Sequence, residues 1–450
     1  MARGKKAAKE LTPEEKLQQA LVPVEEQPYP IPENWCWIKL SNVIELVSGR
    51  DVPLTDCNSE GIGIPYILGA SNIENNTFTV ERWIETPQII SNKGNILLSV
   101  KGTIGKLYIQ QEEQINISRQ IMAIQPLEVL NSKLVYLFLL LVCDELREAG
   151  NGLIPGISRA DILDKAFPFV PFSEQTRIVS RIESLFAKLG EAKEKAQAVV
   201  DGFELRKSAI LHKAFTGELT ERWRKEHGVG LESWKRCTVG SVCNDVKVGI
   251  VIKPSQYYTD KNEGTPAFRS ANVREYRIDD FDWVYLNEDG MVNNKRSIVH
   301  TGDVLVVRSG NPGTACVVSE KFDGYNAIDI LIAVPNQELI LPNYLCLFTN
   351  SPLGKQSVTE GKRGMALVHF NVKGYSKVQL NVPPISEQEK IIHTLNEFLG
   401  KEQQAKEAAK AVLSQIDTMK KAILARAFRG ELGTNDPAEE SAAELIKTVL

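Results

Sequence analysis

The sequence is dominated by an internal repeat, in which residues 171–219 match residues 384–432 at a constant offset of 213. Both copies open with a proline followed closely by Ser-Glu-Gln, and both close with Ala-Phe-x-Gly-Glu-Leu. The serine is suited to cap the start of a helix, and the late glycine, Gly217 or Gly430, lets a helix end in the left-handed conformation. Because no proline and no gap interrupts either copy, each copy is predicted to form one long helix.

Apolar residues recur along each copy in steps of four and three, which is the heptad pattern of a coiled-coil seam. One charged residue interrupts each seam, Arg206 in the first copy and Glu402 in the second. Each helix could pack on its own globular domain, but two equal seams in gap-free register favour pairing with each other. Some 40 helical residues at about 1.5 Å each make a spacer roughly 60 Å long. The seam residues are Ile178, Ile182, Leu185, Leu189, Phe203 and Ile210 in the first copy, and Ile391, Leu395, Phe398, Val412, Ile416 and Ile423 in the second.

A globular unit precedes each of these helices, and the two units repeat each other in order. Trp35 is matched by Trp234, and glycines at 94, 102 and 105 recur with the same separations at 302, 310 and 313. In both units an apolar strand runs into the glycine-rich turn, and a helical segment follows further on. The sequence therefore predicts an α+β fold with two homologous globular domains and two long coiled-coil helices.

The offset between the copies drifts from 199 at the tryptophans to 208 at the glycines and 213 on the helices. Insertions therefore fall in the globular units, which predicts that the helices assemble the molecule while the units recognise different things. Loops also drift in any duplication, which is the alternative explanation. The predicted segments are an N-terminal arm (1–30), a first domain (31–172), a central spacer helix (173–219), a linker with a second domain (220–383), a C-terminal spacer helix (384–432) and a tail (433–450).

Composition limits the classes of protein to consider. The net charge is −4 with a pI near 5.9, so any contact with nucleic acid must come from local basic patches. Seven scattered cysteines without a CxxC pair indicate neither a disulfide framework nor a zinc site, and they favour the cytoplasm. The most apolar run, 134–142, is about half as long as a membrane span and is predicted to be a buried helix, with no membrane association.

Motifs for catalysis are missing from the sequence. The glycine-lysine stretch at 102–106 is too short for a phosphate-binding P-loop, and the Pro-Pro at 383–384 lacks the flanking residues of an amino-methyltransferase motif. The five histidines lack cysteine or acidic neighbours at metal-ligand spacing, so we expect no metal site. A binding protein without catalytic residues is the interpretation that these observations favour. The histidines are His212, His227, His300, His369 and His393.

The paired helix motifs bear a family resemblance. Two variable units, each followed by a helix that opens with Pro-x-Ser-Glu-Gln and closes with Ala-Phe-x-Gly-Glu-Leu, resemble the specificity subunit of type I restriction-modification systems. The segment 302–310 is similar to the family's strand and glycine turn, and the tail at 435–446 also fits.

This resemblance implies two target-recognition domains that each read half of a split site in double-stranded DNA. It implies that the two spacer helices run antiparallel with pseudo-twofold repeat symmetry, and that altering them would change the gap between half-sites. It also implies that this subunit is not an enzyme and holds no cofactor. Methylation of adenine with S-adenosylmethionine would belong to modification subunits, and ATP- and Mg-dependent translocation and cleavage to a restriction subunit, as a defence against foreign DNA.

Charge departs from what a DNA-binding domain suggests. Residues 31–172 hold 11 lysines and arginines against 16 acidic residues, a net charge of −5, and residues 231–383 hold 17 against 16, a net charge of +1. Phosphate contacts need concentrated cations. The candidates for DNA binding are Lys93, Lys101, Lys106 and Arg119 in the first domain, and Arg269, Arg308, Lys362 and Arg363 in the second, with Lys101 and Arg308 foremost because both lie at nearly the same place before the glycine turn.

Two other interpretations compete with a DNA reader. A duplicated protein-interaction scaffold with coiled-coil pairing would suit the acidic balance, although the glycine turns with adjacent Lys101 and Arg308 weigh against it. A degenerate or fused restriction enzyme would require a cluster of carboxylates with a lysine, and the sequence has no convincing one. The recognised bases themselves depend on loop side chains whose arrangement the sequence does not give.

Overall fold

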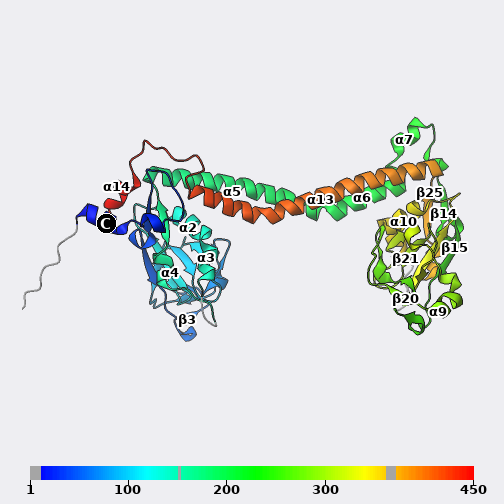
Figure 1. Ribbon diagram of the computed structural model, residues 1–450, viewed down its shortest axis with the longest axis horizontal. Helices are drawn as coiled ribbons and strands as arrows, with labels where there is room; N and C mark the ends of the chain where they lie inside the picture. Colours follow the sequence, from blue (N-terminus) through cyan, green and yellow to red (C-terminus); the bar gives the residue numbers. More distant parts are fainter. Residues whose placement is uncertain (1–11, 151–153, 361–370) are drawn as a thin grey trace, which may run out of the picture. The chain divides into compact units, whose positions relative to one another are not determined.

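The computed structural model describes residues 12–150, 154–360 and 371–450, and it divides into two units (Figure 1). The first unit comprises residues 1–195 and 412–450, and the second comprises residues 196–411. Each unit holds one globular domain and parts of the long helices. Lys362 and Arg363, two of the candidates for DNA binding, lie outside the described residues.

The first domain contains two main sheets, with strand orders β10-β9-β12-β2 and β3-β7-β4-β11-β8, and a separate antiparallel pair β1-β13. The strands are β1 (Cys36–Lys39), β2 (Ile44–Ser48), β3 (Cys57–Asn58), β4 (Ile64–Ile67), β5 (Ile73–Glu74), β6 (Thr77–Phe78), β7 (Trp83–Ile84), β8 (Ile90–Asn92), β9 (Ile96–Ser99), β10 (Leu107–Ile109), β11 (Gln114–Ile117), β12 (Ile121–Pro126) and β13 (Ala166–Phe169). The helices are α2 (Ser132–Leu141), α3 (Cys143–Glu148) and α4 (Arg159–Leu163). The apolar run at 134–142 thus forms most of α2, which is largely buried, as predicted.

The second domain repeats this topology with sheets β15-β24-β21-β22 and β16-β20-β17-β23, and a separate pair β14-β25. Its strands are β14 (Lys235–Thr238), β15 (Cys243–Val248), β16 (Tyr258–Thr259), β17 (Thr265–Phe268), β18 (Val273–Arg274), β19 (Arg277–Ile278), β20 (Val284–Leu286), β21 (Val304–Val307), β22 (Ala315–Val317), β23 (Asn326–Ala327), β24 (Ile330–Pro335) and β25 (Gln379–Val382). Its helices are α8 (Val239–Val242), α9 (Glu288–Asn293), α10 (Pro342–Asn350), α11 (Pro352–Glu360) and α12 (Val372–Ser376).

Equivalent strands confirm the duplication that the sequence predicts. In each domain the strand before the glycine turn, β9 or β21, pairs antiparallel with the strand that follows the turn and with a longer central strand. In each domain one parallel pair joins the same two positions, β4 with β11 and β17 with β23. The six repeated glycines have φ between 77° and 89°, a backbone conformation that glycine adopts without strain.

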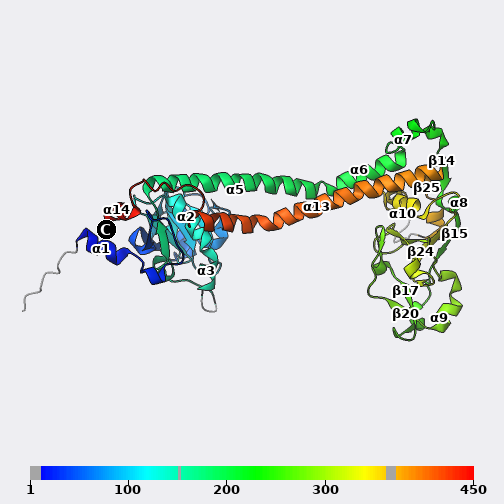
Figure 2. The same cartoon turned by 45° about the horizontal axis from the view of Figure 1, so that its top comes forward.

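The long helices are α5 (Phe172–Asp201), α6 (Phe203–Thr216) and α13 (Ile385–Ala427). In the first unit, Ile178 and Ile182 of α5 share a buried core with Leu424 and Ala427 at the end of α13. In the second unit, Leu211 and other residues of α6 share a core with Ile391 and Leu395 near the start of α13. Each unit therefore pairs one end of a first-copy helix with the opposite end of α13, which makes the pairing antiparallel, and Figures 1 and 2 show the ribbons side by side.

Most predicted seam residues are buried or half-buried, but two are more open. Phe398 and Val412 each keep 39% of their surface exposed. The seam is thus less deeply packed at these two positions than a regular heptad pattern suggests.

The first copy is two helices rather than the single helix that the sequence predicts, with a turn at Gly202 between α5 and α6. Arg206 explains the interruption, since its Nη2 donates to the carbonyl oxygen of Val199 at 2.8 Å. The same guanidinium pairs through Nε with Glu402 of α13 at 2.7 Å. The two charged residues that interrupt the predicted seams are therefore partners of each other in the second unit.

A buried glutamate fixes each helix start to its domain. In the first unit the carboxylate of Glu174 accepts hydrogen bonds from Trp35 Nε1 at 2.7 Å, Thr434 Oγ1 at 3.1 Å and Asn435 Nδ2 at 3.0 Å. The neighbouring Gln175 donates to backbone carbonyls of the first domain and accepts from the backbone N–H of Asn131. The repeated Ser-Glu-Gln is thus the joint between domain and helix.

The equivalent joint in the second unit uses a cation. Glu387 accepts from Trp234 Nε1 at 2.9 Å and Thr220 Oγ1 at 2.7 Å, and it pairs with Arg224 Nη1 at 2.6 Å. Both charged side chains are buried, with Glu387 0% and Arg224 7% exposed. Arg224 belongs to α7 (Glu221–Glu226), which directly follows the first-copy helix pair.

The arm and the tail both belong to the first unit, where α1 (Pro13–Ala20) contacts α14 (Ala442–Lys447). Thr12 and Glu15 form a capping box at the start of α1. Arg177 of α5 binds Glu439 of the tail with two hydrogen bonds of 2.8 and 2.7 Å. The tail therefore packs on the first domain and α5 as part of one core.

Candidate nucleic-acid interface

Several strand ends of the first domain meet at one edge, which we call the first loop edge and define by residues 49–52, 100–106 and 118–120. These segments follow β2, β9 and β11, and the register aligns the end of β2 with the start of β12 and the start of β12 with the end of β9. Backbone hydrogen bonds join the segments, from Gly49 N–H to Ile121 O at 3.1 Å and from Val100 N–H to Gln120 O at 2.8 Å. The loop edge is therefore a fixed surface rather than a set of independent loops.

Close backbone approach holds this edge together. A Cβ atom at Gly49 would lie 2.1 Å from the carbonyl oxygen of Ser118, and one at Gly249 of the second domain would lie 2.2 Å from that of Ala327. Such distances exclude any side chain at either position without movement of the backbone. The same glycine thus brings the same two loops together in both domains.

Cations gather at the first loop edge although the whole domain is acidic. The three segments contain four cations and one carboxylate, Asp51, and Arg159 of α4 adds a fifth cation through its hydrogen bond to Ser48 Oγ at 3.2 Å. A local excess of positive charge on a rigid surface can bind phosphates. The four cations of the segments are Arg50, Lys101, Lys106 and Arg119.

The predicted first-domain candidates separate into two groups. Lys101, Lys106 and Arg119 lie at the loop edge, whereas Lys93 precedes β9 and so lies at the other end of that strand. Lys93 pairs there with Glu113 at 2.8 Å. Arg50 and Arg159 were missed by the sequence analysis because they stand in different segments from the glycine turn, and only the strand register brings them to it.

The second loop edge, residues 249–253, 308–314 and 328–329, has the same framework. Gly249 N–H donates to Ile330 O at 2.9 Å, and Ile250 N–H donates to Ala327 O at 2.8 Å. Arg308 lies in this edge, and Arg269 follows β17 beside it, since Ile328 N–H bonds to Phe268 O. Both arginines form ion pairs, Arg308 with Asp329 at 3.0 Å and Arg269 with Asp282 at 2.7 Å.

Residues 32–199 and 232–413 each match the sequence model of one family, described as the type I restriction modification DNA specificity domain. Each match begins in a globular domain and continues into the helix that follows it. The chain belongs to this family.

Individual relatives agree with the family assignment. The specificity subunit of the type I restriction enzyme EcoKI from Escherichia coli K12 is 25% identical over 304 residues, which cover 63% of this chain and 62% of that subunit. The EcoDI specificity subunit of Escherichia coli is 22% identical over 449 residues, which cover 93% of this chain and 95% of the relative. The chain therefore spans less than two thirds of the EcoKI subunit but nearly all of the EcoDI subunit.

A solved structure shares the fold. The crystal structure of the HsdS subunit from Thermoanaerobacter tengcongensis superposes with a TM-score of 0.67 and 18% identity, covering 91% of this chain and 100% of that one. We accordingly call the two globular domains the first and second specificity domains.

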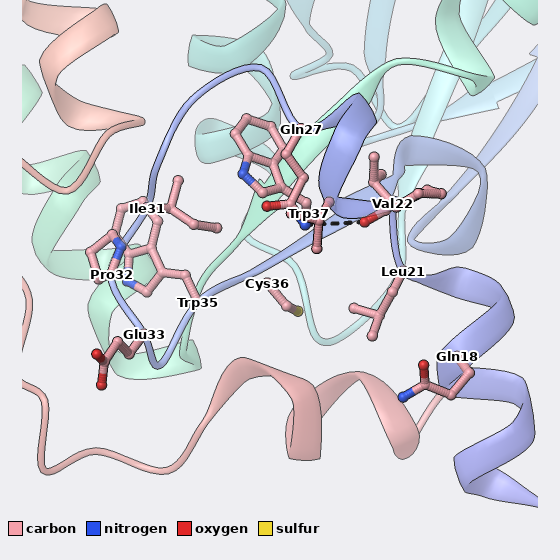
Figure 3. A pocket seen from close by; sticks show the side chains of 12 residues that line it. Gln18, Leu21, Val22, Gln27, Ile31, Pro32, Glu33, Trp35, Cys36 and Trp37 are labelled. Atoms are coloured by element: carbon pink, nitrogen blue, oxygen red, sulfur yellow. Dashed lines mark hydrogen bonds between the residues drawn. The ribbon is translucent and has the colours of Figure 1, made fainter.

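The cavity in Figure 3 lies between the arm and the first specificity domain, with a volume of about 460 Å³. Most of its lining residues are of apolar type, and Trp35 and Trp37 are among them. Glu33 and Cys36 are the lining residues that can ionise, and burial raises the pKa of the Cys36 thiol to about 12. A thiol with such a pKa stays protonated at neutral pH, so this cavity does not supply a nucleophile.

Two further cysteine thiols are also protonated at neutral pH, and the residues that the structure describes form no metal-binding cluster. Burial also raises the pKa of the Cys243 and Cys316 thiols to about 12. No three His, Cys, Asp or Glu residues in the described ranges are grouped to hold a metal ion. Across the same ranges, no helix combines the length and apolar character needed to cross a bilayer.

Proposed function

We propose that this chain is the DNA-reading subunit of a type I restriction-modification complex, in which each specificity domain recognises one half of a split site. The observation that carries this proposal is the first loop edge, where a rigid basic surface stands in a domain with a net charge of −5. Its framework recurs in the second domain with different side chains, as two readers of different sequences require. Family membership supports the same role, since the matched family is described by DNA specificity.

The long helices are proposed to scaffold the complex and to set the spacing between half-sites. Modification subunits would bring S-adenosylmethionine and transfer methyl groups to adenine, and a restriction subunit would use ATP and Mg for translocation and cleavage. The chain itself would hold no cofactor and perform no catalysis, and it would act in the cytoplasm. Lys101, Lys106 and Arg159 are suited to phosphate contacts, which orient a protein on DNA without reading sequence.

The test is methylation mapping by single-molecule sequencing of DNA from cells that express the chain with its modification subunits, and from cells that lack the chain. Methylated adenines in one split motif, present only with the chain, are the expected result. Replacing residues 31–172 with those of a relative should then change one half of the motif and leave the other unchanged.

A protein-interaction scaffold remains the second candidate, favoured by the acidic balance of the chain. It predicts a complex that assembles normally but yields no methylated split motif. That outcome would contradict the DNA-reading role.

A further inference from the structure

Each loop edge carries a charged residue shortly after an equivalent strand, and the two residues are opposite in charge. Arg119 is the second residue after β11, and Asp329 is the second residue after β23, the equivalent strand. The residue before each of them donates its N–H to the end of the neighbouring parallel strand, Ser118 to Ile67 O at 3.1 Å and Ile328 to Phe268 O at 2.8 Å. The two specificity domains therefore present different side chains from corresponding loops, which hold three residues between β11 and β12 and two between β23 and β24.

Each of these residues is held by a counter-ion from another loop of the same edge. Arg119 Nε binds Asp51 Oδ2 at 2.6 Å, and the other carboxylate oxygen of Asp51 accepts the backbone N–H of Arg119 at 3.2 Å. Asp329 Oδ1 binds Arg308 Nη1 at 3.0 Å. Both pairs are intramolecular, so each ion pair neutralises and orients the loop residue that forms it.

In one ion pair the basic side chain is the more exposed, and in the other the acidic side chain is. In the first domain the arginine is the more open, with 65% of the Arg119 side chain exposed against 46% for Asp51. In the second domain the aspartate is the more open, with 44% of the Asp329 side chain exposed against 16% for Arg308. The first loop edge thus presents hydrogen-bond donors and the second presents an acceptor.

Backbone geometry supports a special role for Asp329. Its φ is 53°, in the left-handed region that non-glycine residues adopt at a cost, and its N–H donates to Ile250 O at 3.0 Å. Strained residues of this kind persist where the surrounding structure holds them, and they cluster at binding sites. The strain fixes the direction in which the carboxylate leaves the loop.

Donors and acceptors read different base edges in the major groove. Arginine donates in bidentate fashion to O6 and N7 of guanine, whereas a carboxylate accepts from the amino group of cytosine. In Arg119 the two terminal nitrogens form no hydrogen bond with any residue of the described ranges, so they are free to make that bidentate contact.

We propose that Arg119 and Asp329 are base-reading residues, with Arg119 specifying a guanine in one half-site and Asp329 a cytosine in the other. Asp51 and Arg308 are then positioning residues that hold the readers in place. The inference rests on the proposed function, because it presupposes that the specificity domains contact DNA bases.

The experiment repeats the methylation mapping with the full complex carrying Arg119→Gln or Asp329→Asn. Glutamine and asparagine pair with adenine through its N6 and N7. Arg119→Gln should therefore move one first-domain position from guanine towards adenine, with the other half-site unchanged. Asp329→Asn should move one second-domain position from cytosine towards adenine, with the first half-site unchanged. The loss of preference for the original base is expected to be roughly 5- to 150-fold.

Matched controls neutralise ion pairs away from the loop edges. Lys133→Gln removes the pair with Glu183 in the first unit, and Glu397→Gln removes the pair with Lys401 on α13 in the second. Both controls should leave the motif unchanged. A motif that stays unchanged in Arg119→Gln and Asp329→Asn as well would overturn the inference while leaving the proposed function intact.

A variant that abolishes methylation is resolved by equilibrium competition with duplexes altered at each position of the half-site. Loss of discrimination at a single base pair supports base reading. Equal weakening on every sequence overturns it, because that is the behaviour of a phosphate contact. If the wild-type complex methylates no split motif, the proposed function fails and the inference falls with it.

Discussion

The joints between domain and helix differ in the two units although they are built around the same glutamate. In the second unit Glu387 is neutralised by Arg224, which lies eight residues after Thr216, the last residue of α6. In the first unit Glu174 receives neutral donors from Thr434 and Asn435, which lie in the C-terminal tail. A buried carboxylate needs hydrogen bonds or a counter-ion wherever it stands. The comparison teaches that the repeat preserves the requirement while each unit meets it with different residues.

Removing the tail should produce the largest difference in stability between the two units, because it destabilises only the first. A chain that ends at Gly433 loses the Thr434 and Asn435 hydrogen bonds to Glu174, each bond to a charged group contributing about 1.5–3 kcal/mol. It also loses the buried side chains of α14. Hydrogen exchange read by mass spectrometry should show faster exchange throughout the first unit and little change in the second.

A chain that ends at Asp436 is the control for this truncation. It keeps both donors to Glu174 but lacks Glu439 and α14. Its first unit should be more stable than that of the shorter chain, and equal instability would show that the hydrogen bonds to Glu174 contribute little.

Removing the cation should affect only the second unit. Arg224→Met leaves the carboxylate of Glu387 buried without its counter-ion, and breaking a buried pair in this way costs about 3–5 kcal/mol. Denaturant unfolding with probes in each unit would measure the loss. Adding Glu387→Gln to the same chain should restore much of the stability, because no unpaired buried charge then remains. A double variant as unstable as the single one would contradict this account.

Acid should weaken the first unit through a smaller effect. The hydrogen bonds from Arg177 and then Ser173 lower the pKa of Glu439 to about 2 from its usual 4.5. A depressed pKa stabilises the folded state at pH values above 4.5, and this contribution is lost as the pH falls from 4.5 towards 2. Since the pair is partly exposed, its contribution is about 1 kcal/mol or less.

The measurement for Glu439 compares thermal unfolding of the first unit at pH 6 and pH 3. Glu439→Gln should be less stable than the wild type at pH 6, and the difference should shrink at pH 3. A constant difference at both pH values would show that the charge of Glu439 is not responsible.

The architecture could be predicted from sequence because the repeat is encoded locally. Proline, Ser-Glu-Gln and the closing glycine mark helix ends, and the shared glycine spacing marks equivalent turns. The break at Gly202 could not be predicted in this way, since it depends on Arg206 bonding to Val199 O and to Glu402 across the helix pair. A residue whose partner lies 196 positions away leaves no local signal.

The loop edges were only partly predictable. The glycine turn identified Lys101 and Lys106 directly, but Arg50 and Arg159 join them through the strand register. The buried joint leaves a signal in the sequence, since Trp35 and Trp234 recur together with Glu174 and Glu387 in the two copies. A glutamate repeated at a helix start indicates a buried acceptor, and a repeated tryptophan supplies the matching donor.

The ion pair Arg206–Glu402 also affects whether the long helices pair within one chain or between two newly made chains. Each of the two repeated helices could also pair with a copy of itself from a second chain. By the repeat, Arg206 is equivalent to Met419 and Glu402 to Leu189. Pairing two first-copy helices in the same register would place Arg206 against Leu189, and pairing two second-copy helices would place Glu402 against Met419. Either intermolecular pairing places a charged side chain against an apolar one without a counter-ion. The single ion pair therefore favours pairing of the two helices within one chain.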